Sequence, residues 1–144
     1  MQTNLKTLLI VVICLCTISA CKKNSSGPSA RYQLMVGTWK LVARGIDSNL
    51  NNVIDSNEMI AFNAETDVDN SNGTGLTTVV GLISNSPCTW SLSDNDNYFD
   101  GTSSSGNTKY SYIVRLDSTT SLFKDTSDIN QRGGLPQLWQ YTRQ

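Results

Sequence analysis

Short segments in which hydrophobic and polar residues alternate run through most of the chain. Segment 109–117, KYSYIVRLD, places Tyr110, Tyr112, Val114 and Leu116 on one face and mostly polar residues on the other. The same period of two appears in CTWSLS, TWKLVA and QLWQYTR. Because successive side chains of a β-strand point to opposite faces, this pattern predicts half-buried strands.

Turn signals such as SDNDN, SSSGN and LDSTT separate these segments. No segment of the mature chain has the length and 3.6-residue period of a good helix. Residues 34–144 are therefore predicted to form one all-β domain, an eight-stranded antiparallel up-and-down meander that closes as a barrel. An open sandwich of the same strands is the alternative. The other predicted strands are 59–63, 74–83, 97–101 and 121–125.

The first 20 residues follow a different pattern. A short polar start with one Lys precedes the apolar run 7–20, which is too short to span a membrane and fits a secretory signal peptide. The end of this run, Ile18-Ser19-Ala20-Cys21, resembles a bacterial lipobox. The resemblance implies cleavage before Cys21, a diacylglycerol on its sulfur and an acyl chain such as palmitate on the new amine. The alternative is an ordinary signal peptide with a chance Cys.

The residues after Cys21 predict how the chain is attached. Segment 21–33 is expected to be the lipidated Cys and a flexible polar tether, and more than one lipid chain gives stable anchoring. Lys22 and Lys23 would lie against anionic headgroups. Surface-exported lipoproteins of Bacteroidetes often carry an acidic run here, which this tether lacks. We therefore expect a bacterial outer-membrane lipoprotein, on the periplasmic face rather than the cell surface.

Composition narrows the chemistry of the mature chain. Cys14 and Cys16 leave with the predicted signal and Cys21 is lipidated, so Cys88 remains alone and no intrachain disulfide is expected. The chain has no His, the commonest general base and transition-metal ligand, and no Gly-rich phosphate loop. We therefore expect no enzymatic activity. No basic stripe is present, so no nucleic-acid partner is expected.

Short motifs resemble a known family. Segment 35–41, MVGTWKL, carries the Gly-x-Trp that opens the first strand of the lipocalin-like domain lipoproteins of Bacteroidetes. Trp90-Ser-Leu and the aromatic-rich last strand are similar to theirs. The resemblance implies a calycin barrel in which Trp39 packs at the base against Arg143. The alternative is that Trp39 is plain core and Arg143 is solvated. The structural residues implied are Gly37, Trp39 and Arg143.

The stretch DSNLNNVIDSNE, residues 47–58, has the ligand spacing of a calcium-binding loop. It lies between predicted strands rather than helices, and Asn52 stands where Gly is usual, although Asn tolerates a left-handed backbone. Few of its ligands are anionic, so we expect weak binding of about 0.1–1 mM. The alternative is an Asx-turn loop whose side chains satisfy the local backbone. The candidate calcium ligands are Asp47, Asn49, Asn51, Val53, Asp55 and Glu58.

Two other stretches rich in Asp and Asn, DVDNSNG from Asp67 and DNDNYFD from Asp94, are predicted to be turns. Two functions then remain. One is a binding module for a small apolar or amphipathic ligand, and the other is a structural or interaction lipoprotein with a filled barrel and an envelope protein partner. A pocket above about 300 Å³ would favour the first. The candidate interior ligand residues are Phe62, Trp90, Tyr110, Tyr112 and Trp139.

Overall fold

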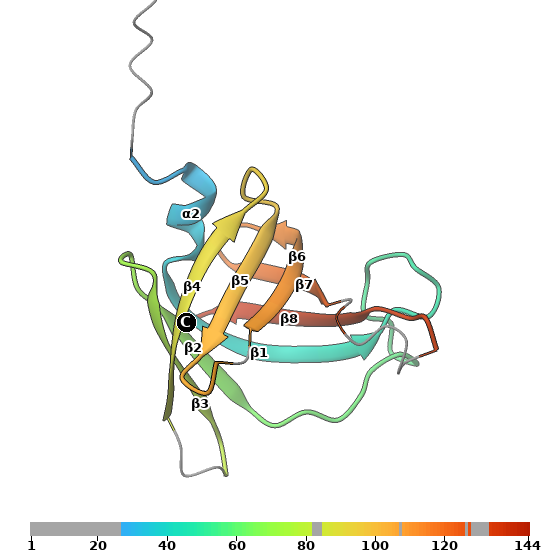
Figure 1. Cartoon of the computed structure of the whole chain (residues 1–144). Coiled ribbons are helices and arrows are strands. Elements are labelled where there is room, and N and C mark those ends of the chain that lie inside the picture. Colours follow the sequence, from blue (N-terminus) through green and yellow to red (C-terminus); the bar gives the residue numbers. More distant parts are fainter. Residues whose placement is uncertain (1–26, 82–84, 107, 126, 128–132) are drawn as a thin grey trace, which may run out of the picture.

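A closed eight-stranded antiparallel barrel is the architecture of this chain. The computed structural model describes residues 27–81, 85–106, 108–125, 127 and 133–144. Each strand pairs with its neighbour in sequence, and β1 pairs with β8 to complete the ring, which confirms the predicted up-and-down barrel and excludes the open sandwich (Figure 1). The elements are α2 (Ala30–Met35), β1 (Gly37–Ile46), β2 (Glu65–Asp69), β3 (Thr74–Val79), β4 (Asn85–Ser93), β5 (Tyr98–Ser103), β6 (Thr108–Leu116), β7 (Thr120–Asp125) and β8 (Gln137–Arg143).

The second strand differs from the prediction. The expected strand 59–63 is wrong, because its Met59 forms only an isolated bridge with Gly45. The strand is instead Glu65–Asp69, which pairs with β1 and β3 on its two edges. The prediction that DVDNSNG is wholly a turn is wrong for the same reason, since the turn begins only at Asn70. The sequence ETDVD has little hydrophobic alternation, so its strand state depends on these two ladders.

The faces of β6 are inverted relative to the prediction. Tyr110 and Tyr112 are 48% and 42% exposed, while Ser111 and Ile113 are each 1% exposed. The two tyrosines pack outside on Tyr98, with ring centroids 4.6 and 5.3 Å away. Cross-strand aromatic pairs of this kind stabilise the outer face of a sheet. The prediction that these tyrosines face the interior is therefore wrong.

A β-bulge in β6 explains why the alternation of hydrophobic residues predicted the wrong inward face. The register between β6 and β7 shifts between Ile113 and Arg115. A bulge inserts one residue and reverses which side chains point inward beyond it. As a result Leu116, on the same nominal face as the tyrosines, packs against the buried core while they do not.

One end of the barrel is closed by the short helix α2 (Figure 1). It starts within the segment expected to be tether, with Ser29 as N-cap: the Ser29 hydroxyl accepts from the Tyr32 N–H at 2.9 Å. Tyr32 stacks on Trp90 with centroids 4.5 Å apart. Trp39 donates from Nε1 to the Met35 carbonyl at 2.7 Å, which ties the helix to β1. No helix in the described part of the chain is long and apolar enough to cross a bilayer.

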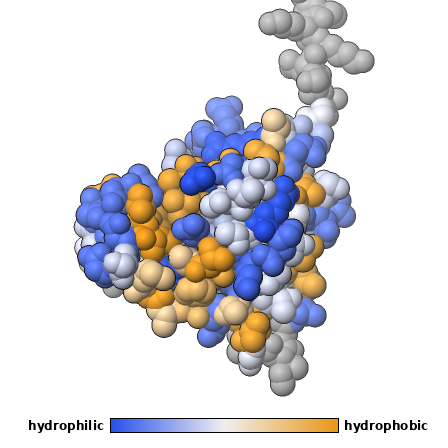
Figure 2. Space-filling view, turned by 180° about the vertical axis from the view of Figure 1, so that it is seen from behind, coloured by the Kyte–Doolittle hydropathy of each residue, from blue (hydrophilic) through white to orange (hydrophobic). Residues whose placement is uncertain are grey.

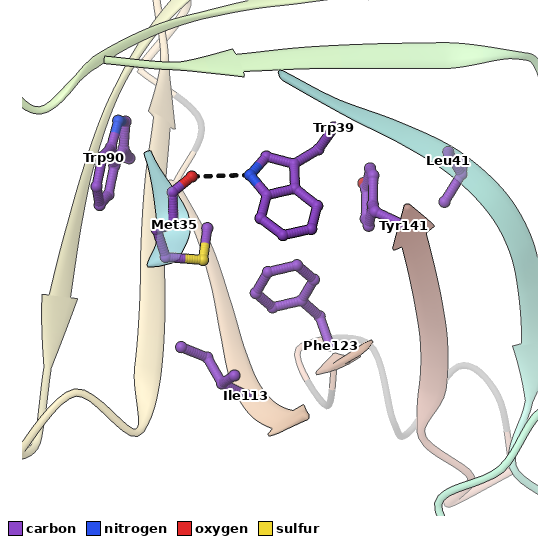
Figure 3. Close-up of a cluster of buried hydrophobic side chains, with 7 residues drawn as sticks. All are labelled: Met35, Trp39, Leu41, Trp90, Ile113, Phe123 and Tyr141. Atoms are coloured by element: carbon purple, nitrogen blue, oxygen red, sulfur yellow. Dashed lines mark hydrogen bonds between the residues drawn. The ribbon is translucent and has the colours of Figure 1, made fainter. Parts of the chain in front are cut away.

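The core lies between this helix and the middle of the barrel. Figure 3 shows Trp39 and Phe123 pointing toward one another, with Tyr141 beside Trp39 and Met35 between Trp39 and Trp90. Burial of these large side chains supplies the main driving force for folding, since a buried aromatic or aliphatic side chain contributes about 1.5–3 kcal/mol. The buried cluster comprises Met35, Trp39, Leu41, Trp90, Ile113, Phe123 and Tyr141.

The Gly-x-Trp motif, Gly37 and Trp39, contacts Arg143 at the base of the barrel, the end that α2 closes. The guanidinium carbon of Arg143 lies 5.0 Å from the centroid of the Trp39 ring, as the resemblance implied, and Arg143 also donates to the Val36 carbonyl. Gly37 has φ +153°, and a Cβ there would lie 2.6 Å from Nη2 of Arg143. Gly37 is therefore required both for its backbone conformation and for the space that the guanidinium fills.

The outer surface is mixed. On the face shown in Figure 2, hydrophilic residues interleave with hydrophobic residues, which form several small groups. Among the larger exposed hydrophobic side chains, Leu50 and Val53 lie in the loop after β1, and Val80 lies in the turn after β3. Scattered apolar residues of this kind are ordinary on a protein surface and do not define a docking patch.

Candidate functional site: the barrel cavity

A cavity of about 330 Å³ lies inside the barrel. Helix α2 and every strand contribute to its wall, so it is a property of the closed barrel rather than of one segment. Its volume is at the lower end of the range for small-molecule sites. The lining residues are Met35, Trp39, Glu65, Asp67, Asp69, Thr77, Cys88, Phe99, Gly101, Ser103, Ser111, Ser121, Phe123, Trp139 and Tyr141.

Aromatic rings make up the apolar part of the wall. Phe123 is central: its ring centroid lies 5.5 Å from that of Phe99 and 5.8 Å from that of Tyr141. The first contact is tilted and the second is edge-to-face, which are the favoured geometries for aromatic pairs. Gly101 keeps space open beside Phe99, since a Cβ there would lie 3.0 Å from that ring. A small apolar body would meet rigid, well-packed surfaces here.

The polar part of the wall is dominated by one strand. Glu65, Asp67 and Asp69 alternate along β2 and all line the cavity. Tyr141 donates from its hydroxyl to Glu65 at 2.8 Å, and Thr77 donates from Oγ1 to Asp67 at 2.6 Å. Among the described residues, the lining includes no Lys, Arg or His. We call these three carboxylates the acidic row.

Burial and mutual repulsion alter the ionisation of this region. Burial first, and then the negative charge of Asp67, raises the pKa of Asp69 to about 7. Burial, followed by the charges of Asp67 and Glu65, raises the pKa of Tyr141 well above its usual value, so its hydroxyl stays protonated and can donate. The pKa of the Cys88 thiol is also raised, mainly by burial and then by Asp69. Cys88 is thus a protonated, weakly reactive thiol in the wall.

Two hydroxyl groups on β6 and β7 complete the polar wall. Ser111 and Ser121 are each 1% exposed and both line the cavity. The Oγ of each has no hydrogen-bond partner within the described part of the chain. In the order of the strands around the ring, β6 is diametrically across from β2, so a hydroxyl wall stands opposite the acidic row. A buried hydroxyl without a partner costs free energy, which a polar ligand group or an ordered water would recover.

The structure separates the predicted ligand residues. Trp139 lines the cavity. Trp90 is buried beneath α2, stacked on Tyr32 and Phe99, and Phe62 packs against the core from the connection before β2. Neither is a lining residue, and Tyr110 and Tyr112 are on the outer face.

Sequence reasoning missed the acidic row and the serines. Glu65, Asp67 and Asp69 belong to a segment that was divided between a connection and a turn. Their spacing of two was the available signal, since it places all three carboxylates on one face if the segment is a strand. That face is inward only because β2 pairs with β1 in the observed register, Asp67 opposite Trp39.

The second region with predicted chemistry is the loop 47–58 between β1 and β2. Asp47 is fully buried, and its backbone N–H donates to the Pro136 carbonyl at 3.0 Å. Its Oδ2 accepts from the Asn52 N–H at 3.2 Å and lies 3.6 Å from Lys124 Nζ. Its Oδ1 is buried without a hydrogen-bond partner among the described residues. Asn52 has φ +59°, the left-handed conformation that a calcium loop requires at this position.

Side-chain hydrogen bonds close the rest of the loop. Glu58 accepts from the Ser48 N–H at 2.8 Å, from the Ser48 hydroxyl and from the Asn49 N–H at 3.3 Å. The Ser48 hydroxyl, followed by these N–H groups, holds the pKa of Glu58 below its usual value. Asn49 and Asn51 both donate to Asp55 Oδ2, at 2.9 and 3.1 Å.

The loop therefore brings most of the predicted ligands into one hydrogen-bonded network. Val53 contributes its N–H, which donates to Asn51 Oδ1 at 2.8 Å. Among the residues that the structure describes, no group of three or more acidic, Cys or His side chains is arranged to hold a metal ion. The observed arrangement corresponds to the Asx-turn alternative, in which the side chains satisfy the backbone.

The predicted lipidation residue, Cys21, lies outside the described residues. Comparison with known protein families, with characterised proteins and with solved structures finds no match.

Proposed function

We propose that this chain is a lipid-anchored, non-catalytic binding module of the bacterial envelope, which takes a small amphipathic ligand into its barrel. The observation that carries the proposal is the cavity of about 330 Å³, walled by aromatic rings and a few buried polar groups. Binding pockets have this composition, and the volume exceeds the roughly 300 Å³ below which a filled barrel would be preferred.

The location in this proposal comes from the sequence. The lipobox-like Ile18–Cys21 and the apolar run before it support attachment at Cys21, and the tether without an acidic run supports the periplasmic face of the outer membrane. The short tether would hold the barrel close to the bilayer, where amphipathic small molecules concentrate. The resemblance of Gly37 and Trp39 to the lipocalin-like lipoproteins of Bacteroidetes supports the same interpretation.

Filling the cavity tests the binding function. Three probes share a phenyl ring and a short linker but differ in head group: 2-phenylethylammonium, 2-phenylethanol and 3-phenylpropanoate. Binding to the full chain in a maltoside detergent is followed by tryptophan fluorescence, because Trp39 and Trp139 line the cavity. We expect at least one probe to bind the unmodified chain and Ser91→Leu, whose position is exposed, but not Ser111→Leu, which fills the cavity. Binding of no probe, or equal binding by Ser111→Leu, would favour the structural lipoprotein with an envelope protein partner.

A second candidate function is weak calcium binding by the loop 47–58. The observation that favours it is the buried, unpartnered Oδ1 of Asp47 beside an Asn52 that already has the required left-handed backbone. Calcium would take Glu58 away from the Ser48 and Asn49 N–H groups that it now accepts from. That competition, and the nearby Lys124, support the low affinity expected from the ligand charges.

Thermal melts of the full chain in EDTA and in up to tens of millimolar calcium test this candidate. Ligand at 100 times its dissociation constant adds about 2.7 kcal/mol to the free energy of unfolding. We expect a calcium-dependent rise in Tm that Asp47→Asn and Glu58→Gln abolish and that matched sodium chloride does not reproduce. An equal rise in sodium chloride, or no rise, would leave the loop as a polar turn.

A further inference from the structure

The polar groups of the cavity identify the charge of its ligand. We propose that the cavity binds small molecules that carry an ammonium group on a short aromatic or apolar body. The inference rests on the proposed binding function and names the ligand class for the same cavity. It is carried by the acidic row on one wall and by the unpartnered hydroxyls on the other.

The acidic row sets the sign of the potential. Three carboxylates, Glu65, Asp67 and Asp69, face one cavity, and none of the described residues that line it is basic. Inside a protein the effective dielectric constant is far below that of water, so these charges attract a cation much more strongly than they would at the surface. A bound anion would be repelled by the same charges, and a neutral hydroxyl could donate a hydrogen bond to a carboxylate but would gain no attraction between opposite charges.

The ionisation of the innermost carboxylate agrees with this sign. Asp69 is 6% exposed, and its neighbours across the ladders are Gly37 and Gly75, which bring no charge. Burial and the adjacent Asp67 raise its pKa to about 7. Burial is the larger cause and the charge of Asp67 the smaller, so this carboxyl is partly protonated near neutral pH, and an entering ammonium group would favour its ionised form.

The hydroxyl wall provides the independent observation. Ser111 and Ser121 have buried Oγ atoms with no hydrogen-bond partner in the described part of the chain, and both line the cavity. A hydroxyl oxygen has two lone pairs and accepts from N–H donors. An ammonium group carries several N–H donors and no acceptor, so it can satisfy carboxylates and hydroxyls together. A carboxylate ligand could accept from the hydroxyls but would face the acidic row.

The aromatic wall of the cavity suits the apolar body of the proposed ligand. Phe99, Phe123 and Tyr141 form a connected cluster of rings next to these polar groups. Aromatic faces attract cations as well as apolar bodies, which is why cages of such rings recognise ammonium compounds. The limited volume of about 330 Å³ selects a small ligand rather than a long-chain lipid.

The head-group series tests the ligand class directly on the unmodified full chain in maltoside detergent. We expect 2-phenylethylammonium to bind with a dissociation constant at least ten-fold lower than 2-phenylethanol, and 3-phenylpropanoate to bind most weakly, since the acidic row attracts the cationic head group and repels the anionic one. Equal or tighter binding of the alcohol or the carboxylate would overturn the ligand class while leaving the binding function intact. Binding of no probe would overturn both.

Charge neutralisation assigns the preference to the acidic row. We expect Asp67→Asn/Asp69→Asn to lose the preference for the ammonium probe by ten-fold or more while keeping its affinity for 2-phenylethanol. The matched control, Asp94→Asn, removes the same charge from an exposed turn and should keep the preference. A double variant that keeps the preference would show that the acidic row does not recognise the head group. If the double variant does not fold, the head-group series on the unmodified chain still decides the proposal.

Discussion

The hydroxyl of Tyr141 donates a hydrogen bond of 2.8 Å to Glu65, which connects β8 to β2 past the strand that lies between them. Tyr141 is 4% exposed, and its pKa is raised well above the usual value by burial and by the neighbouring carboxylates. The donor therefore stays protonated at neutral pH. The contact fixes Glu65, the first carboxylate of the acidic row, relative to the aromatic wall.

Tyr141→Phe should remove this hydrogen bond without changing the packing of the ring. We expect a loss of about 1–2 kcal/mol in the free energy of unfolding, because Glu65 loses a donor but remains half-buried. A domain of this size would show a decrease in Tm of several degrees. Thermal melts of the full chain measure it, with Tyr110→Phe on the outer face as control. Equal effects of the two substitutions would contradict a role for the Glu65 contact.

The base of the barrel gives a steric prediction. Gly37→Ala places a Cβ 2.6 Å from Arg143 Nη2 and imposes a strained φ, so we expect a loss of about 1–3 kcal/mol in the free energy of unfolding. Urea unfolding of the full chain measures the change. Gly27→Ala is the control, because its Cβ would contact nothing within 4 Å. A neutral effect of Gly37→Ala would show that Arg143 can move away at little cost.

Arg143 itself is predicted to contribute through two kinds of contact. Arg143→Ala removes the guanidinium from the Trp39 ring and from the Val36 carbonyl, and we expect a loss of about 1–3 kcal/mol by urea unfolding. The matched control is Arg115→Ala, because Arg115 forms an exposed ion pair with Asp117 at 2.8 Å. Exposed pairs contribute about 0–1 kcal/mol. A larger effect at Arg115 than at Arg143 would contradict this assignment.

How far the sequence predicts this barrel depends on what faces its interior. Strands β1, β4 and β8 were recognised because their inward positions carry Trp39, Trp90 and Tyr141. Strand β2 was missed because its inward positions carry carboxylates. Asp residues next to Asn are also typical of a solvated turn, so the segment did not stand out as a strand. Hydrophobic alternation therefore finds the strands that contribute large core residues and overlooks the one that carries the acidic row.

The same limit applies to side-chain direction. Tyr110 and Tyr112 are as hydrophobic as many core residues, and alternation alone cannot tell that Ser111 and Ile113 face inward instead. The bulge after Ile113 and the stacking of the tyrosines on Tyr98 determine which side chains face inward. Both depend on how β6 pairs with the neighbouring strands β5 and β7. The loop 47–58 was easier to predict from the sequence, because its ligand spacing and its turn-forming residues are both local features.

The raised pKa of Asp69 predicts a pH dependence of stability. Its carboxyl binds a proton more tightly in the folded protein, with a pKa of about 7 against a usual value of 3.8. Its contribution is therefore fully present below pH 3.8, decreases as the pH rises, and is lost above about pH 7. We expect the free energy of unfolding to fall by roughly 2 kcal/mol between pH 5 and pH 8.

Urea titrations of the full chain at pH 5, 6, 7 and 8 measure this slope, and Asp69→Asn should flatten it. The control, Asp94→Asn, should keep the slope because Asp94 lies in an exposed turn. Glu58 and Asp117 have lowered pKa values, so their contributions are lost only in more acidic solution, outside this window. A slope unchanged by Asp69→Asn would assign the dependence to another group.

The proposed anchor gives a prediction independent of the barrel. Cys21→Ser removes the only sulfur that the lipobox-like segment offers to a lipid, so the chain should lose stable membrane attachment. Fractionation of cells that produce the full chain should find the unmodified protein in the outer membrane and Cys21→Ser outside it. Cys88→Ser is the control, because Cys88 lies in the cavity wall and should leave the fractionation unchanged. Mass spectrometry of the intact mature protein should also show two kinds of added lipid on the unmodified chain and on Cys88→Ser, and none on Cys21→Ser. An unmodified chain that fractionates like Cys21→Ser would contradict the anchor and leave the cavity proposals standing.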